Sequence, residues 1–294
     1  MTSSAAPSLA SSRSEFLRAR GLRHHIRCWG DRSAPKVFLG HGLLDVSATF
    51  QPLVEPLLDR WQVLAPDWRG FGYTEWPQDG YWFHDYVGDL EAIADHFAPG
   101  ERLRLVGHSM GSQIMSLYAG LRPAQVQKLV LLDGITLPDM PATLAPQRFR
   151  KWLDHLRDPV TQRNYPSFDD LAARIRRKHP QLGPEQALFV ARCWGREDGH
   201  GRITLLADPR HLRNGPGLYH AADSDAIWRE VTAPTLFVDA GKSEFANVLT
   251  PEQRSLRRAN FRDHRSVRVE DAGHMLHFDR PVETAKLIAY FLAG

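Results

Sequence analysis

One short motif constrains the fold of this chain more than any other feature. Residues 107–111 read G-x-S-x-G, follow an apolar run and precede a helix-like segment at 110–120. The pattern predicts a strand, a sharp reversal at Ser109 and a helix that begins beside it. A side chain at Gly107 or Gly111 would collide with neighbouring backbone, so glycine suits both positions. The Ser109 hydroxyl then projects above a sheet, at a helix N-terminus that stabilises negative charge.

Apolar, strand-like runs alternate with helix-like segments on both sides of this motif. Strands are predicted at residues 36–39, 62–67, 103–106, 128–133, 235–238 and 266–269, helices at 84–97 and 281–292, and a hairpin at 16–29. This alternation predicts an α/β fold with a mostly parallel central sheet flanked by helices.

The alternation breaks between residues 137 and 225, where helix formers, Arg and Pro dominate and a β-like run occurs near 203–206. We expect an inserted helical cap at 137–225, a core formed by 15–136 and 226–294, and a disordered tail at 1–14. The large apolar side chains of the cap are expected to form its own core rather than line a pocket. They are Phe149, Trp152, Leu153, Leu156, Phe168, Phe189, Trp194 and Tyr219.

Composition excludes several classes of protein. The formal net charge of +3 over 294 residues is too small to predict a nucleic-acid partner, and the densest basic run, at 174–178, fits a solvated helix face. Two cysteines far apart in the chain favour a reduced, cytoplasmic protein over a disulfide scaffold. Residues 1–14 lack the basic start and apolar core of a secretory signal, and no apolar run is long enough to span a membrane, so we expect neither a secretory signal there nor membrane insertion. Its oligomeric state is left open.

A serine nucleophile needs a base, and histidine titrates in the right range. Of the 14 histidines, His274 lies in the loop after the predicted strand at 266–269 and before the last helix, where a base that serves Ser109 is expected. His277 is the alternative and is expected to pack or to line the pocket. His108 is expected to turn away from Ser109.

Acyl transfer places negative charge on a carbonyl oxygen, which two backbone N–H groups normally bind. One is predicted to belong to Met110, the residue after the nucleophile. The other is predicted to belong to Leu43, in the loop after the strand at 36–39.

With these residues placed, the chain resembles the α/β-hydrolase superfamily from about residue 16 to residue 292. The resemblance is carried by residues 40–42, 67–72, 107–111 and 271–274. Within the superfamily, residues 41–45 and 272–277 are similar to bacterial serine-hydrolase-like proteins of the carboxylesterase type. Haloalkane dehalogenases and epoxide hydrolases of this fold use an aspartate nucleophile, so Ser109 disfavours both activities.

The resemblance implies a third residue, a carboxylate that orients His274. In this fold the acid commonly follows the strand that here starts after Pro234, but that position falls near Ser243, and Glu244 lies one residue beyond it. Asp133 ends the predicted strand at 128–133, where some haloalkane dehalogenases also carry their acid. We favour Asp133, with Glu244 as the alternative and Asp239 as a weaker third candidate.

The sequence therefore predicts a serine hydrolase that cleaves small-molecule carboxylic esters through an acyl-enzyme on Ser109, with neither metal nor organic cofactor. The same residues also serve carbon–carbon bond hydrolases and amidases, which remain alternatives. A small-molecule receptor on a hydrolase scaffold is an alternative of another class.

Overall fold

The computed structural model describes residues 10–213 and 215–294. Its central sheet contains the strands β1 (Arg13–Ala19), β2 (Leu22–Trp29), β3 (Lys36–Gly40), β4 (Gln62–Pro66), β5 (Leu103–His108), β6 (Val126–Leu132), β10 (Thr235–Ala240) and β11 (His264–Val269). Their order across the sheet is β1-β2-β4-β3-β5-β6-β10-β11. The β1–β2 and β2–β4 pairs are antiparallel, and the other pairs are parallel. The predicted α/β fold with a mostly parallel sheet is confirmed.

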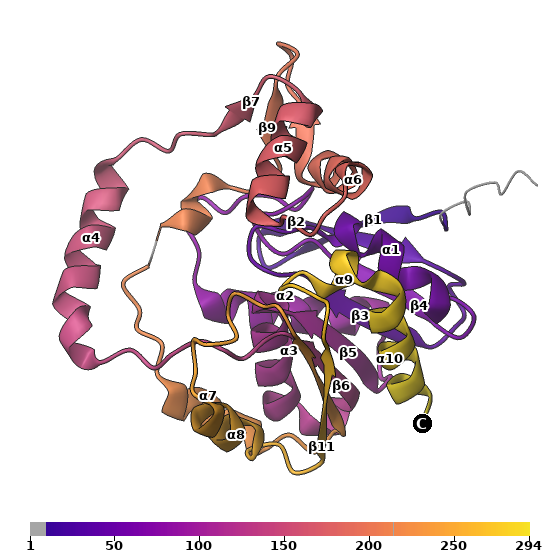
Figure 1. Ribbon diagram of the computed structural model, residues 1–294. Coiled ribbons are helices and arrows are strands. Elements are labelled where there is room, and N and C mark those ends of the chain that lie inside the picture. Colours follow the sequence, from indigo (N-terminus) through magenta and orange to yellow (C-terminus); the bar gives the residue numbers. More distant parts are fainter. Residues whose placement is uncertain (1–9, 214) are drawn as a thin grey trace, which may run out of the picture.

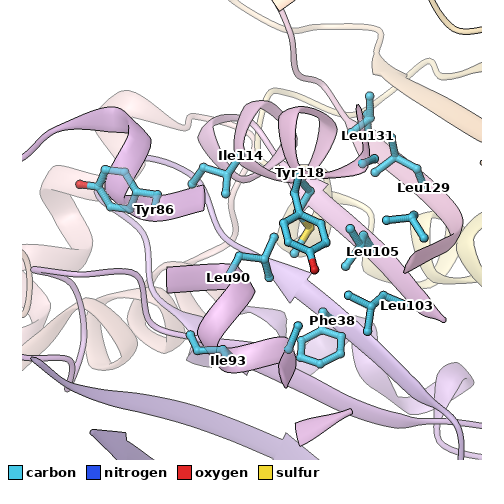
Figure 2. Packing of buried hydrophobic residues seen from close by; sticks show 14 of the residues in the cluster. Phe38, Tyr86, Leu90, Ile93, Leu103, Leu105, Ile114, Tyr118, Leu129 and Leu131 are labelled. Carbon is cyan, nitrogen blue, oxygen red and sulfur yellow. The ribbon is translucent and has the colours of Figure 1, made fainter. Parts of the chain in front are cut away.

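Helices cover both faces of this sheet (Figure 1). They are α1 (Gln51–Val54), α2 (Phe83–Phe97), α3 (Met110–Leu121), α7 (Ala221–Trp228), α8 (Pro251–Arg258), α9 (Leu276–Asp279) and α10 (Pro281–Ala293). On one face, Leu90 of α2 and Ile114 of α3 pack against Phe38 and Leu105 of the sheet (Figure 2). On the other face, Ile288 of α10 belongs to a second apolar cluster. Burial from both sides explains why the central strands read as nearly continuous apolar runs.

Strand β1 begins inside the stretch expected to be a disordered tail. Arg13 pairs with Cys28, and the Ser14 hydroxyl lies 2.9 Å from His25 Nε2. The expectation is therefore wrong for Arg13 and Ser14, because these polar residues add an edge strand to the sheet. The part of the tail at 1–9 lies outside the described residues.

Segment 137–225 contains the helices α4 (Ala145–Arg157), α5 (Phe168–Lys178) and α6 (Pro184–Trp194). It also contains a small antiparallel sheet of β7 (Asn164–Tyr165), β9 (Ile203–Leu205) and β8 (Gly195–Glu197), in that order. Among the described residues, none of its strands joins the central sheet. Helix α7 crosses the expected boundary at residue 225, and its Trp228 is buried in the main core.

Helix α4 differs from the expectation for the cap's apolar residues. Phe168, Phe189 and Trp194 pack against a common core with Leu171 and Val190. Helix α4, by contrast, buries no residue, and Figure 1 shows it set apart from the other helices. Its side chains Phe149, Leu153 and Leu156 are exposed, and Trp152 is half-buried. The expectation is wrong there because helical spacing shows that one face is apolar but does not show that another element covers it.

Among the described residues, no helix combines the length and apolar character required to cross a lipid bilayer.

Candidate active site

The chain reverses sharply where β5 ends and α3 begins. Ser109 occupies this reversal with φ 51° and ψ −115°, a conformation that is rare for a residue with a side chain. A Cβ on Gly107 would overlap the backbone of Gly111, and a Cβ on Gly111 would overlap the carbonyl of Gly40. The glycines therefore let β5 pass closely beneath α3, as the motif predicts.

Three predicted residues from distant parts of the chain meet in one hydrogen-bonded row. Ser109 Oγ lies 2.9 Å from His274 Nε2, and His274 Nδ1 lies 2.7 Å from Asp133 Oδ2. With its proton on Nδ1, the imidazole would donate to Asp133 and accept from the Ser109 hydroxyl. His274 and Asp133 are both buried, which shields their contact from water.

Asp133 is also held by groups at the end of β10. The Ser243 hydroxyl donates to Asp133 Oδ2 at 2.5 Å, and the Ala240 N–H donates to Oδ1 at 3.3 Å. These bonds fix the carboxylate plane relative to His274. Ser243 stands where the usual acid of the fold was expected, and it donates to the carboxylate from β6.

The competing carboxylates lie elsewhere. Glu244 is exposed and lines the cavity described below. Asp239 forms an ion pair with Arg258 at 2.5 Å. Among the described residues, Asp133 supplies the carboxylate that is hydrogen-bonded to His274.

The predicted oxyanion donors lie beside Ser109. Met110 begins α3, and Gly42 approaches so closely that an added Cβ would lie 3.1 Å from the Ser109 Cβ. The amide N–H groups of Leu43 and Met110 have no acceptor within the part of the chain that the structure describes. Both residues line the same cavity as Ser109.

A second buried cluster lies behind this row. His108 Nε2 lies 2.8 Å from the His274 carbonyl, which supports the loop that carries His274. His277 Nε2 lies 3.0 Å from Asp45 Oδ2, and the Trp194 indole N–H donates to Asp45 Oδ1 at 2.7 Å. Burial raises the pKa of Asp45, but the bonds from His277 and Trp194 outweigh it and hold this pKa below its usual range.

Neither Asp45 nor Trp194 was predicted to support the loops around Ser109. Asp45 is the last residue of the run at 41–45 that resembles serine-hydrolase-like proteins, and this resemblance was the one feature of the sequence that pointed to it. Trp194 was expected to pack in the cap's own core rather than line a pocket. It packs there, but it also lines the cavity and donates to Asp45. His108 and His277 turn away from the cavity, and neither lines it.

Asp45, His108 and His277 could each offer a metal ligand, since their ligand atoms lie within 4.8 Å of one another. However, His277, Trp194 and Thr49 already donate to the Asp45 carboxylate, and one nitrogen of His108 is hydrogen-bonded to the His274 carbonyl. Burial lowers the pKa of His108 well below the usual range and keeps its ring neutral. The arrangement is that of a hydrogen-bonded cluster supporting the loops around Ser109.

A cavity of about 1600 Å³ opens above Ser109 and His274. Aromatic residues supply much of its lining: Tyr81, Trp82, Phe83, Tyr86, Trp152, Trp194 and Phe245. A serine hydroxyl, a histidine and a buried carboxylate in one hydrogen-bonded row, at the base of a largely apolar cavity, are the groups expected of a hydrolase site.

Comparison with known proteins agrees with this class. Residues 35–281 match the profile of the alpha/beta hydrolase fold family, and the chain belongs to that family. It is 28% identical to a 2-(acetamidomethylene)succinate hydrolase of Mesorhizobium japonicum, over 88% of each chain. It is 26% identical to a serine hydrolase-like protein of Danio rerio, over 90% of this chain and 83% of the other. The expected resemblance to the superfamily is thereby confirmed.

A solved structure titled as a thioesterase domain from the curacin biosynthetic pathway superposes with a TM-score of 0.83. It is 23% identical and covers 95% of this chain and 99% of its own, which is a likeness of fold. Family and relatives together support hydrolase activity, and they leave the bond that is cleaved open.

Proposed function

We propose that this chain is a serine hydrolase of carboxylic esters in which Ser109, His274 and Asp133 form the catalytic triad. The observation that supports this most directly is the hydrogen-bonded row from Ser109 Oγ through His274 to Asp133. The alternative acids Glu244 and Asp239 are not proposed, because neither carboxylate is hydrogen-bonded to His274 among the described residues.

In this mechanism, Ser109 Oγ attacks the ester carbonyl carbon while its proton passes to His274 Nε2. The carbonyl oxygen takes up negative charge and accepts hydrogen bonds from the N–H groups of Leu43 and Met110. The bond to the alcohol oxygen then breaks, and His274 gives its proton to that oxygen. Water, deprotonated by His274, attacks the acyl-enzyme, and the acid leaves as the Ser109 hydroxyl is restored. Asp133 stabilises the imidazolium throughout.

The proposal is tested by labelling and turnover. A fluorophosphonate is expected to label the chain once, at Ser109, and Ser109→Ala is expected to lower the hydrolysis of p-nitrophenyl acetate by about 10⁴-fold or more. Thermal unfolding of the variant serves as the control for folding. Labelling at another serine, or full turnover by Ser109→Ala, would refute the mechanism. Absence of ester turnover in a folded, unlabelled wild type would favour the receptor alternative.

An amide or related substrate is the second candidate, because one relative is named a 2-(acetamidomethylene)succinate hydrolase. The same triad can cleave such bonds. A p-nitroanilide matched in acyl group to the p-nitrophenyl ester separates the two candidates. The amide is favoured if its kcat/KM equals or exceeds that of the ester despite its poorer leaving group.

We further propose a small-molecule substrate and a reducing, cytoplasmic setting. In the described residues, Cys28 and Cys193 are free thiols, and burial raises the pKa of each to about 12. Thiols of this kind are largely protonated at neutral pH and are poor nucleophiles.

A further inference from the structure

Helix α4 carries an apolar stripe that no other element within residues 10–213 and 215–294 covers. Phe149, Trp152, Leu153 and Leu156 recur at the spacing that places them on one helix face. Phe149 is 51%, Leu153 50% and Leu156 65% exposed. An exposed, contiguous apolar surface of this kind usually marks a binding site.

Polar contacts hold α4 in place. The Arg213 guanidinium donates to the carbonyls of His155 at 2.6 Å and Asp158 at 3.1 Å, which caps the C-terminal end of α4. Arg148 donates to the Gly215 carbonyl at 2.9 Å. The helix is thus anchored through backbone acceptors while its apolar face stays free.

The stripe is continuous with the cavity above Ser109. Trp152 and Leu156 line that cavity together with Ser109 and His274. Exposed apolar side chains outside α4 also line the cavity: Leu43, Trp82, Leu137 and Phe245. The volume of about 1600 Å³ exceeds that of most drug-sized ligand sites, so the cavity has room for much more than a short ester.

The cations of the cavity wall are mostly engaged with protein groups. Arg210 pairs with Asp208, and Lys242 pairs with Asp271 at 2.7 Å. Arg213 donates to the backbone carbonyls of His155, Asp158 and Pro159, and Lys178 is the lining cation that has no partner among the described residues. One exposed lysine opposite so much apolar surface favours an uncharged chain over an acidic one.

We propose that the stripe of α4 and the apolar cavity wall together bind a long apolar chain, such as an octanoyl or dodecanoyl group, whose ester carbonyl lies at Ser109. The inference rests on the proposed function for its chemistry, and the binding site itself is tested separately. We expect the apolar chain of the substrate to occupy this site. The experiments below distinguish it from a chain that carries a charge.

The first experiment measures kcat/KM for the p-nitrophenyl esters of acetate, butyrate, octanoate and dodecanoate, below their aggregation limits. Wild type is expected to prefer octanoate to acetate by at least tenfold. Leu153→Gln and Leu156→Gln, both exposed changes that retain helix propensity, are expected to lower the octanoate-to-acetate ratio about tenfold, mainly through KM. Arg150→Gln, an exposed change on the polar face of the same helix, is the matched control and is expected to keep the ratio.

The second experiment measures binding without turnover. Ser109→Ala is titrated with 2-pentanone and 2-decanone, which keep a carbonyl but cannot be hydrolysed. The longer ketone is expected to bind at least tenfold more tightly, and Leu156→Gln in the same background is expected to remove most of that gain. Chain-length binding without ester turnover would retain the site and refute only the esterase proposal.

Three results would overturn the inference while leaving Ser109 chemistry intact. In the first, Ser109 is labelled but kcat/KM stays constant or falls as the acyl chain lengthens. In the second, the α4 variants lower kcat/KM equally for all esters. In the third, the protein prefers an ester whose chain ends in a carboxylate. The last result would assign the cavity to acidic acyl groups and Lys178 to their recognition.

Discussion

At the scale of single residues, backbone strain gathers around the site. Five residues other than glycine have positive φ among those described, namely Arg20, Leu44, Ser109, Asp133 and Ile135. Arg20 belongs to the β1–β2 turn, and the other four lie in the loops around the hydrogen-bonded row. Such conformations are costly and persist where the surroundings enforce them, as they commonly do at functional sites. The loops of Ser109 and Asp133 are therefore pre-shaped before any ligand binds.

Asp133→Asn is expected to lower kcat for p-nitrophenyl acetate by about 10³–10⁴-fold, because the amide no longer holds His274 in the required tautomer. Glu244→Gln, one residue beyond Ser243, is the matched control and is expected to stay within about threefold of wild type. Both variants should first be shown to be folded by circular dichroism. A crippled Glu244→Gln beside an active Asp133→Asn would move the acid to Glu244.

Local sequence predicted these residues unequally well. Ser109, Met110, Leu43 and His274 follow from motifs within a few positions of a strand end, so spacing was sufficient to nominate them. Asp133 could be favoured only by its position at the end of β6. Asp133 follows β6 and Glu244 follows β10, and which of these strand ends lies beside His274 depends on the pairing of distant strands. The bond from Trp194 to Asp45 joins residues 149 apart in the chain, which local patterns do not reveal.

At the scale of elements, Trp194 at the end of α6 connects segment 137–225 to the loop after β3. Its indole N–H donates to buried Asp45, whose other oxygen faces His277 before α10. Three elements thus share one buried carboxylate, and the loop that carries Leu43 is held between them. Helix α4 is the opposite case: its periodicity predicted a buried face, but no element in the described part of the chain covers that face.

Trp194→Phe is expected to lower the free energy of unfolding by about 1–3 kcal/mol, since it deprives a buried carboxylate of a donor. Trp152→Phe, whose indole has no acceptor among the described residues, is the matched control and is expected to change stability by less than about 0.5 kcal/mol. Urea denaturation measures both. Equal effects of the two changes would show that the loss of indole packing, rather than of the bond to Asp45, determines stability.

At the scale of the whole molecule, buried neutral histidines make stability depend on pH. Burial lowers the pKa values of His24, His41 and His108. Burial also lowers the pKa of His211 to about 3, where the ring stacks on Phe71 with centroids 3.8 Å apart. Because the unfolded chain binds these protons more readily, stability is full above the unfolded pKa near 6.5 and is lost as pH falls toward the folded values.

For His211 alone, the loss between pH 7 and pH 5 is expected to be on the order of 2 kcal/mol. His211→Phe keeps the aromatic stack but cannot take up a proton, so its stability should fall less steeply over this range. His220→Phe, at an exposed position, is the control and should keep the wild-type slope. Urea midpoints at pH 5, 6 and 7 measure the three slopes. Identical slopes for wild type and His211→Phe would show that His211 is protonated equally in both states.

The position of Asp133 on β6 has a consequence for how this protein can change. The loop after β10 contributes Ser243 to the carboxylate, but its next residues, including Phe245 and Val248, line the cavity. Residues 244–248 can therefore vary in size and polarity without replacing any member of the proposed triad. We expect a library randomised at these positions to yield variants that differ in substrate preference and still react with a fluorophosphonate at Ser109.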